Sequence, residues 1–308
     1  MENNISNQTL EKLAEVHIKD IKSKRRWKLF VRTIVVLFIL IMIVPGLFGS
    51  SSKELSPHIA LVKVQGVIAE DSEANADRII KSLDDAYASK FTKAVIVEVD
   101  SPGGSPVQSD EIYSHMRYLQ EKHHKIPMYA VCTDVCASGG YYVAVGAKEV
   151  YVNKMTITGS IGVVGSGFGF TGLMDKLGIK RRTYTSGNNK DFLDPFSPEK
   201  PSQTKQFKKL LDETHKVFIN AVEESRGDRL KDKSMATTFS GAPFSGIEAK
   251  KIGLIDGFAS VNQLKREKLE NLEVVDYTQP LDFLTAVSNK LGNSVYYKAL
   301  SESSFSFK

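Results

Sequence analysis

Apolar residues follow two different periods along this chain, and together they predict an α/β protein. Runs that are nearly all apolar and rich in β-branched residues are typical of buried parallel strands, and they occur at 58–69, 94–99 and 128–131. Helical spacing of apolar positions occurs at 77–90, 107–122 and 137–147. Because strand and helix alternate, the pattern predicts a parallel sheet with right-handed crossovers.

The second half of the chain has a less regular pattern. Strand candidates lie at 149–152 and 180–185, an apolar stretch that can form a helix at 168–177, a long amphipathic helix at 202–226 and a short helix at 246–252. Residues 156–165 are rich in glycine and β-branched residues, so this segment can lie close against a ligand or a neighbouring backbone.

The longest apolar run lies near the N-terminus. Residues 33–48 carry no charge, and counting from Leu29 gives about 20 helical residues, enough to cross a hydrocarbon core ~30 Å thick. The Lys/Arg residues that precede the run place the N-terminus in the cytoplasm and everything after Ser50 across the membrane. A cleaved signal peptide is the alternative, but the long polar region before the run and the lack of a clear cleavage site favour an uncleaved anchor.

These features divide the chain into five predicted segments. They are a cytoplasmic segment at 1–28, a transmembrane helix at 29–48, a linker at 49–57, a folded domain at 58–277 and a C-terminal helical tail at 278–308. The net charge of +5 comes from the N-terminal region, since the chain beyond Arg32 has 33 Lys/Arg against 32 Asp/Glu. Nucleic-acid binding by the folded domain therefore has no support.

Ser138 is the first candidate for chemistry. It follows the strand at 128–131 and is followed at once by Gly139 and Gly140, where a helix is predicted to begin. A serine at a strand-to-helix turn presents its hydroxyl beside free backbone N–H groups, which can stabilise an oxyanion. A plain helix-capping serine with a glycine turn is the alternative.

A glycine-rich turn, Gly103-Gly104, follows the preceding strand. Because functional loops gather at the carboxyl ends of parallel strands, we expect this turn to lie beside Ser138 and Gly139. An ordinary tight turn would have the same composition.

A nucleophilic serine needs a base, and the sequence offers no histidine in a motif context and no G-x-S-x-G elbow. A lysine held neutral is the other known solution, which requires its pKa to fall from ~10.4 to near 7–8. The residue pattern alone selects no single lysine.

The histidines and cysteines suggest no further chemistry. Six histidines without metal-ligand spacing predict no metal site. Cys132 and Cys136 are expected to be buried free thiols, with a disulfide as the alternative in an extracytoplasmic domain.

Five motifs in order resemble signal peptide peptidase A, a family of membrane-anchored serine proteases with a Ser/Lys dyad. They are VDSPGG at 99–104, CASGGYYVA at 136–144, TGSIGVV at 158–164, SGNNKDF at 186–192 and SGIEAKKIGLIDG at 245–257. The resemblance extends from about Ile59 to Asp256 and is to the short, single-repeat bacterial members.

The resemblance implies a role for each matched residue. Ser138 matches the nucleophile, Lys190 the general base and Ser160 the serine that hydrogen-bonds the base. The backbone of Gly103, Gly104 and Gly139 matches the oxyanion hole.

It further implies a crotonase- and Clp-protease-like α/β spiral as the fold of the protease domain at 58–277, and a reaction without cofactor or metal. The implied location is the bacterial inner membrane, with the protease domain on the extracytoplasmic side. The implied partners are hydrophobic peptide substrates such as remnant signal peptides, membrane lipid around the N-terminal helix, and other copies of the chain in a homo-oligomeric ring. In such a ring Ser138 and Lys190 would meet across a subunit boundary.

Two other functions are compatible with this fold. A catalytically silent membrane scaffold would have no reason to retain both Ser138 and Lys190. A crotonase-like acyl-CoA enzyme would hold acidic catalytic residues on its loops and would not need an anchor.

Overall fold

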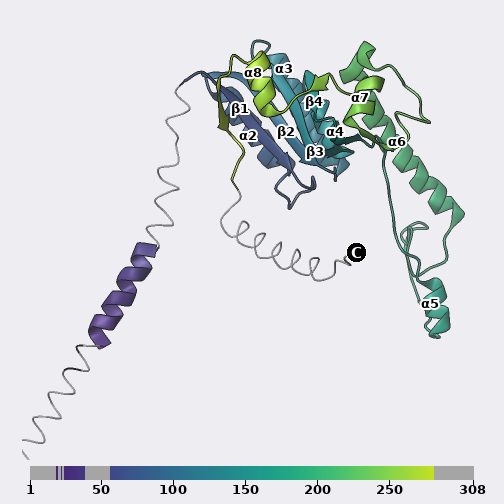
Figure 1. The fold of residues 1–308 in the computed structure, drawn as a ribbon. Coiled ribbons are helices and arrows are strands. Elements are labelled where there is room, and N and C mark those ends of the chain that lie inside the picture. Colours follow the sequence, from purple (N-terminus) through teal and green to yellow (C-terminus); the bar gives the residue numbers. More distant parts are fainter. Residues whose placement is uncertain (1–18, 20–21, 23, 39–55, 281–308) are drawn as a thin grey trace, which may run out of the picture. The chain divides into compact units, whose positions relative to one another are not determined.

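The computed structural model describes residues 19, 22, 24–38 and 56–280 of the chain. The chain forms two compact units, Met1–Lys53 and Glu54–Lys308, and each is described by itself. In the first unit, residues 24–38 are helical (Figure 1). Within the described ranges no helix has both the length and the apolar character needed to cross a membrane. Residues 39–48 of the predicted transmembrane helix and residues 281–308 of the predicted tail lie outside the described residues.

A mostly parallel sheet organises the second unit. Its strands are β1 (His58–Gln65), β2 (Thr92–Ser101), β3 (Met128–Ala137), β4 (Glu149–Val152), β5 (Ile157–Gly159), β6 (Pro243–Ser245), β7 (Gly257–Phe258) and β8 (Glu273–Asp276). The strand order is β6-β5-β3-β2-β1-β8, and β4 pairs with β3 and β7. Only β5 and β6 are antiparallel among the paired strands described. The expected α/β fold with a largely parallel sheet is therefore confirmed.

Helices cover the sheet on both faces, whereas α5 (Thr171–Lys176) lies away from it (Figure 1). The other helices are α2 (Ala76–Ala88), α3 (Pro106–Lys122), α4 (Gly139–Ala144), α6 (Pro201–Arg226), α7 (Gly246–Ile252) and α8 (Val261–Lys268), with a 3₁₀ turn at Gly227–Arg229. Along β1, Ala60 and Val62 join the larger core under α2 and α3, while Ile59 and Leu61 join a second core that includes Leu264 of α8. This alternation follows from the two-residue period of a strand.

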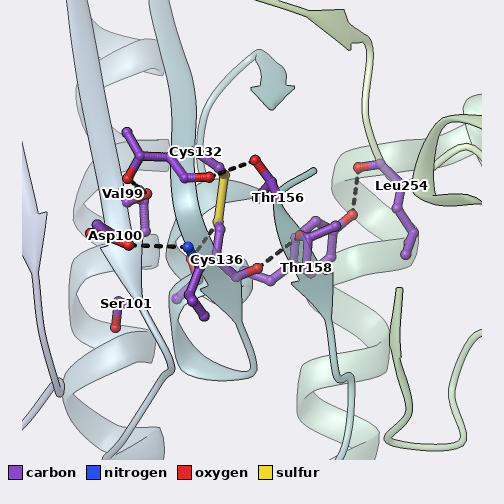
Figure 2. Close-up of a disulfide and its surroundings, with 12 residues drawn as sticks. Val99, Asp100, Ser101, Cys132, Cys136, Thr156, Thr158 and Leu254 are labelled. Carbon is purple, nitrogen blue, oxygen red and sulfur yellow. Dashed lines mark hydrogen bonds between the residues drawn. A yellow bond between two sulfur atoms is a disulfide. The ribbon is translucent and has the colours of Figure 1, made fainter. Parts of the chain in front are cut away.

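β3 carries a bulge that the sequence pattern did not predict. Val99 and Ser101 of β2 pair with Cys132 and Cys136 of β3, so a step of two residues along β2 matches a step of four along β3. The bulge shortens the distance between the Cα atoms of Cys132 and Cys136 to 5.6 Å, whereas four residues of regular strand span about 13 Å. The expectation of two free thiols is therefore wrong, because the bulge brings these cysteines together as a disulfide (Figure 2).

Several predicted elements agree closely with the structure and one does not. The strand at 149–152 and the helices at 202–226 and 246–252 are confirmed as β4, α6 and α7. The strand predicted at 180–185 is wrong: this segment pairs with no other strand among the residues described. β-branched composition alone does not make a strand, since a strand is stabilised by pairing with a neighbour.

Candidate active site

Ser138 occupies a strained turn between β3 and α4. Its φ of 52° and ψ of −124° lie in a region that non-glycine residues rarely adopt. The Ser138 N–H donates to the carbonyl of Gly159 at 2.8 Å, and the Tyr142 N–H donates to the Ser138 carbonyl at 2.9 Å. Its side chain makes no capping hydrogen bond to α4, so the plain helix-cap interpretation is not supported.

The loop after β2 packs directly against this turn. A Cβ atom added to Gly103 would be 2.7 Å from Gly139 N, and one added to Gly139 would be 3.2 Å from Gly104 N. Gly104 is held in place by Ile68, since the Ile68 N–H donates to Gly103 O at 2.9 Å and the Ser105 N–H donates to Ile68 O at 2.8 Å. The expected closeness of the two glycine turns is thus present, and side chains at these positions would prevent it.

Two of the three backbone N–H groups predicted for the oxyanion hole are available. Within the described part of the chain, the N–H groups of Gly104 and Gly139 donate to no acceptor, and Gly139 opens α4, where helix N–H groups have no helical partner. The Gly103 N–H instead donates to Ser101 Oγ at 3.1 Å. Gly103 therefore contributes close packing, and Gly104 and Gly139 are the free donors.

Ser138 lines a cavity of about 450 Å³. Gly104, Gly139 and Ser160 lie in its wall with Ser138, and so do Val163, Val164, Thr214, His215, Val217 and Phe218. The Ser160 hydroxyl donates to the Gly241 carbonyl at 3.1 Å, which leaves its oxygen able to accept a further hydrogen bond. The cavity thus combines a serine hydroxyl, two free N–H donors and apolar walls.

Lys190 lies outside the cavity that contains Ser138. It is exposed in a turn at 187–190, and it is absent from the cavity wall. Its neighbour Asp191 accepts a hydrogen bond from Gln203 at 3.1 Å, near the start of α6, whereas His215 of the same helix lines the cavity. These two positions on α6 are about 18 Å apart along the helix axis. One chain alone therefore does not bring Lys190 to Ser138.

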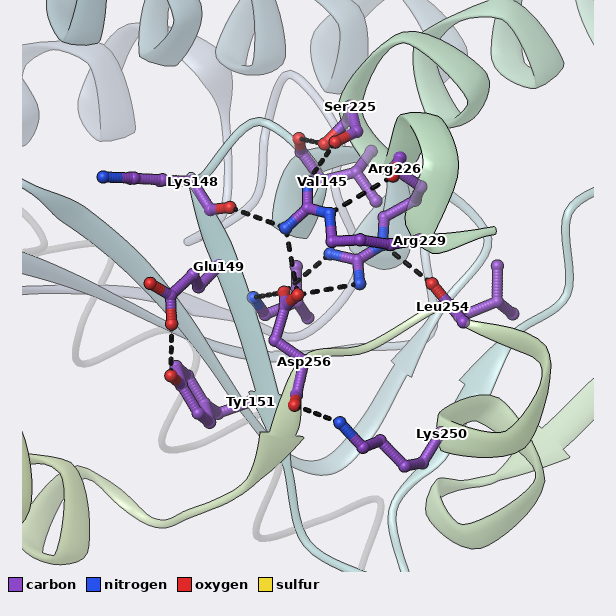
Figure 3. A network of polar contacts seen from close by, with 12 residues as sticks. Val145, Lys148, Glu149, Tyr151, Ser225, Arg226, Arg229, Lys250, Leu254 and Asp256 are labelled. Atoms are coloured by element: carbon purple, nitrogen blue, oxygen red, sulfur yellow. Dashed lines mark hydrogen bonds and ion pairs between the residues drawn. The ribbon is translucent and has the colours of Figure 1, made fainter. Parts of the chain in front are cut away.

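A buried ion pair fixes the C-terminal end of α6, the helix whose middle borders the cavity. Arg226 is 1% exposed and donates two hydrogen bonds to the Asp256 carboxylate, at 2.7 and 3.1 Å (Figure 3). The Val150 N–H of β4 donates to the same carboxylate at 2.8 Å. Burial opposes ionisation of Asp256, but the hydrogen bonds from Arg226 outweigh it and lower the pKa of this carboxyl group. The network ties α6 to the sheet behind the nucleophile turn.

Sequence reasoning missed three side chains of the cavity. Tyr142, Asp110 and His215 line it, and the His215 Nε2 lies 2.9 Å from the Ile161 carbonyl oxygen. Tyr142 is four residues after Ser138, so helical spacing would have placed it near the nucleophile turn. Asp110 and His215 carry no such local signal, because α3 and α6 meet only in the folded chain.

Comparison with known proteins gives a family match. The model of peptidase family S49 matches residues 120–275, a range that includes Ser138, Ser160 and Lys190. A putative signal peptide peptidase SppA from Enterococcus faecium is 31% identical over 260 residues, which cover 80% of this chain and 73% of that protein.

Two other similar proteins differ more in length or sequence. A protein of Brucella abortus named Na(+)/H(+) antiporter NhaA is 40% identical over 198 residues, which cover 64% of this chain but only 26% of that protein. The matched part of this chain thus spans only about a quarter of the Brucella protein. Among solved structures, the 1510-N membrane-bound stomatin-specific protease has a TM-score of 0.44 and 17% identity, covering 73% of this chain and 99% of that one.

The family model matches half of the chain, and the Enterococcus protein is similar over most of its length. Both findings agree with the five motifs that resemble signal peptide peptidase A. The chain belongs to peptidase family S49, the family of the SppA proteins.

Proposed function

We propose that this protein is a serine endopeptidase in which Ser138 is the nucleophile. The observation that carries the proposal is the arrangement of Ser138 in a cavity wall beside Gly104 and Gly139, whose N–H groups have no acceptor in the described part of the chain. Acyl transfer needs an attacking hydroxyl and donors for the oxygen that becomes negative, and both are together here.

The proposed reaction proceeds through an acyl-enzyme. The Ser138 Oγ attacks a peptide carbonyl as a base takes its proton, and the N–H groups of Gly139 and Gly104 hold the oxyanion. The amine product leaves with a proton returned by the base. Water then attacks the ester, and the acid product leaves with Ser138 restored.

We assign the base to Lys190 of a neighbouring copy of the chain, with Ser160 holding its amine. Two observations support this assignment. Lys190 is exposed, and its neighbour Asp191 binds Gln203, which lies about 18 Å along α6 from His215 in the cavity wall. Residues 163–184 between Ser160 and Lys190 also expose large apolar side chains, including Phe168 at 82% and Tyr184 at 90%. A second copy that covered them would also remove Lys190 from water, which favours the neutral amine that a base requires.

Membrane location, fold type and substrate class complete the proposal. The predicted helix at 29–48 would anchor the chain in the bacterial inner membrane, with the protease domain outside the cytoplasm. The protease domain would have an α/β spiral fold of the crotonase and Clp-protease type. Hydrophobic peptides, such as signal peptides left after cleavage, are the proposed substrates, because Val163, Val217 and Phe218 give the cavity apolar walls.

The membrane orientation has a test of its own. Protease added to intact spheroplasts should digest the protease domain, and protection of that domain would contradict the proposed orientation.

Hydrolysis of a fluorogenic peptide with an apolar residue before the scissile bond tests the activity. The wild-type protein should cleave it, and Ser138→Ala should lower kcat by at least about 10³-fold. Ser202→Ala, which changes an exposed serine at the start of α6, serves as the matched control and should leave the rate unchanged. Cleavage that survives Ser138→Ala would contradict the proposal.

A further inference from the structure

Asp110 places a carboxylate in the wall of the cavity that contains Ser138. It lies in the second turn of α3, five residues after the serine that caps this helix, and its side chain is half-buried. Its Oδ1 accepts a hydrogen bond from the Tyr142 hydroxyl at 2.6 Å. The carboxylate is therefore held by Tyr142 in the wall of the cavity that contains Ser138.

No cation of the described residues neutralises this carboxylate. Asp110 forms no ion pair there, and its Oδ2 has no hydrogen-bond donor. Two other carboxylates of the same unit are paired: Asp191 lies 2.5 Å from Lys200 Nζ, and Asp256 binds Arg226. Asp110 therefore offers an acceptor oxygen in the cavity wall to a cation that enters the cavity.

Tyr142 stabilises this arrangement without competing for the free oxygen. Burial, together with its hydrogen bond to Asp110, raises the pKa of the Tyr142 hydroxyl far above neutral pH. The hydroxyl therefore stays protonated and donates to Oδ1, which leaves Oδ2 for another donor.

The neighbouring surface suits a side chain that is apolar along its length and charged at its tip. The rings of Tyr142 and Phe218 pack with their centroids 4.8 Å apart, and both line the cavity with Val163. Lysine and arginine carry an aliphatic stem that packs against such surfaces, while their charged ends make hydrogen bonds to carboxylates.

We propose that Asp110 selects substrates that place a lysine or arginine side chain in the cavity beside Ser138. The inference rests on the proposed peptidase activity and names the substrate class of that same site. Peptides with a basic residue next to an apolar stretch fit this cavity, and the amino-terminal end of a signal peptide has that composition.

Matched peptides test the proposal on the wild-type protein. A set of fluorogenic peptides carries either lysine or norleucine, which has a straight aliphatic side chain without the charge, at one of the four positions before the scissile bond. At one position, kcat/KM should be at least about 10-fold higher for lysine, the value expected for a charged hydrogen bond. Equal rates or a preference for norleucine at every position would overturn the proposal.

Variants identify the source of the preference. Asp110→Asn keeps the size of the side chain and should abolish the lysine preference, so that the ratio of kcat/KM for lysine and norleucine peptides falls to about 1. Glu121→Gln removes an exposed charge from the same helix outside the cavity, and it should retain the preference. A lysine preference that persists in Asp110→Asn would assign the selection to another residue and overturn the proposal.

Failure of the activity itself would look different. Loss of all cleavage by the wild-type protein, or cleavage that survives Ser138→Ala, would refute the peptidase and with it the role of Asp110. Normal, Ser138-dependent cleavage of norleucine peptides without a lysine preference would refute the role of Asp110 alone. If Asp110→Asn does not fold, as judged by circular dichroism, the comparison of peptides on the wild-type protein still decides.

Discussion

The backbone of Gly103 lies so close to Ser138 that a Cβ atom added to Gly103 would be 2.8 Å from the Cβ of the serine. The φ of Gly103 is +100°, a conformation that only glycine adopts without strain. The loop after β2 thus supports the nucleophile turn by direct contact, and its geometry depends on the absence of a side chain.

Gly103→Ala should therefore nearly abolish peptide hydrolysis. The added methyl group must displace Ser138 or Gly139, and a shift of about 1 Å at a reacting group lowers the rate by roughly 10²-fold. Gly66→Ala is the matched control, because Gly66 also has a positive φ, +80°, but has nothing within 4 Å of the added atom. Comparable kcat/KM for the two variants would mean that contact with Ser138 is unimportant.

Asp256→Asn should destabilise the fold strongly at pH 7. It would leave the buried Arg226 guanidinium without a counter-charge, and breaking a buried pair in this way costs about 3–5 kcal/mol. Urea unfolding followed by circular dichroism measures the loss. Asp276→Asn, which breaks the more exposed pair with Lys63, should lower the free energy of unfolding by no more than about 1 kcal/mol.

The same pair predicts a pH dependence. Because the pKa of Asp256 is lower in the folded protein than the ~3.9 of an unfolded chain, its stabilisation is present above about pH 4 and is lost as pH falls through the folded-state value. The difference in stability between wild type and Asp256→Asn should thus shrink below pH 4. A difference that stays constant down to pH 2 would show that ionisation of Asp256 does not matter.

The disulfide between Cys132 and Cys136 should add modest stability. It closes a loop of only five residues, which corresponds to about 2 kcal/mol from restricting the unfolded chain. Dithiothreitol should lower the urea midpoint of the wild-type protein and leave a Cys132→Ala/Cys136→Ala double variant unaffected. Two iodoacetamide adducts on unreduced, denatured protein would show free thiols instead.

The sequence predicted the elements whose patterns are local. β4, α6 and α7 follow from apolar spacing, and a capping box of Ser245 and Glu248 starts α7 in the structure. The bulge in β3 has no such signal, because polar Thr133 and Asp134 interrupt the apolar run and only pairing with β2 shows that the strand continues to Ala137.

The candidate site was predictable to a similar degree. Ser138 and the glycine turns follow from motifs at the ends of strands, and the structure brings them together. The contribution of α6 was not predictable, since Thr214, His215 and Phe218 reach the cavity only through long-range packing. The position of Lys190 outside that cavity could not be inferred from the spacing of the two residues along the chain.

Lys190→Arg should be almost inactive. A base must exist in its neutral form, and a guanidinium stays charged at any pH at which the protein is folded. Lys180→Arg changes another exposed lysine of the same segment and should keep the wild-type rate. More than a few per cent of wild-type hydrolysis in Lys190→Arg would exclude this lysine as the base.

Mixing two inactive variants tests the shared site most directly. Ser138→Ala retains Lys190, and Lys190→Ala retains Ser138, so a boundary between the two kinds of subunit can contain one intact serine and one intact lysine. Under conditions where subunits exchange, as shown by energy transfer between labelled chains, peptide hydrolysis should return well above that of either parent. If exchange is complete and the mixture stays as inactive as the parents, Ser138 and Lys190 do not act across a subunit boundary, and the account is wrong.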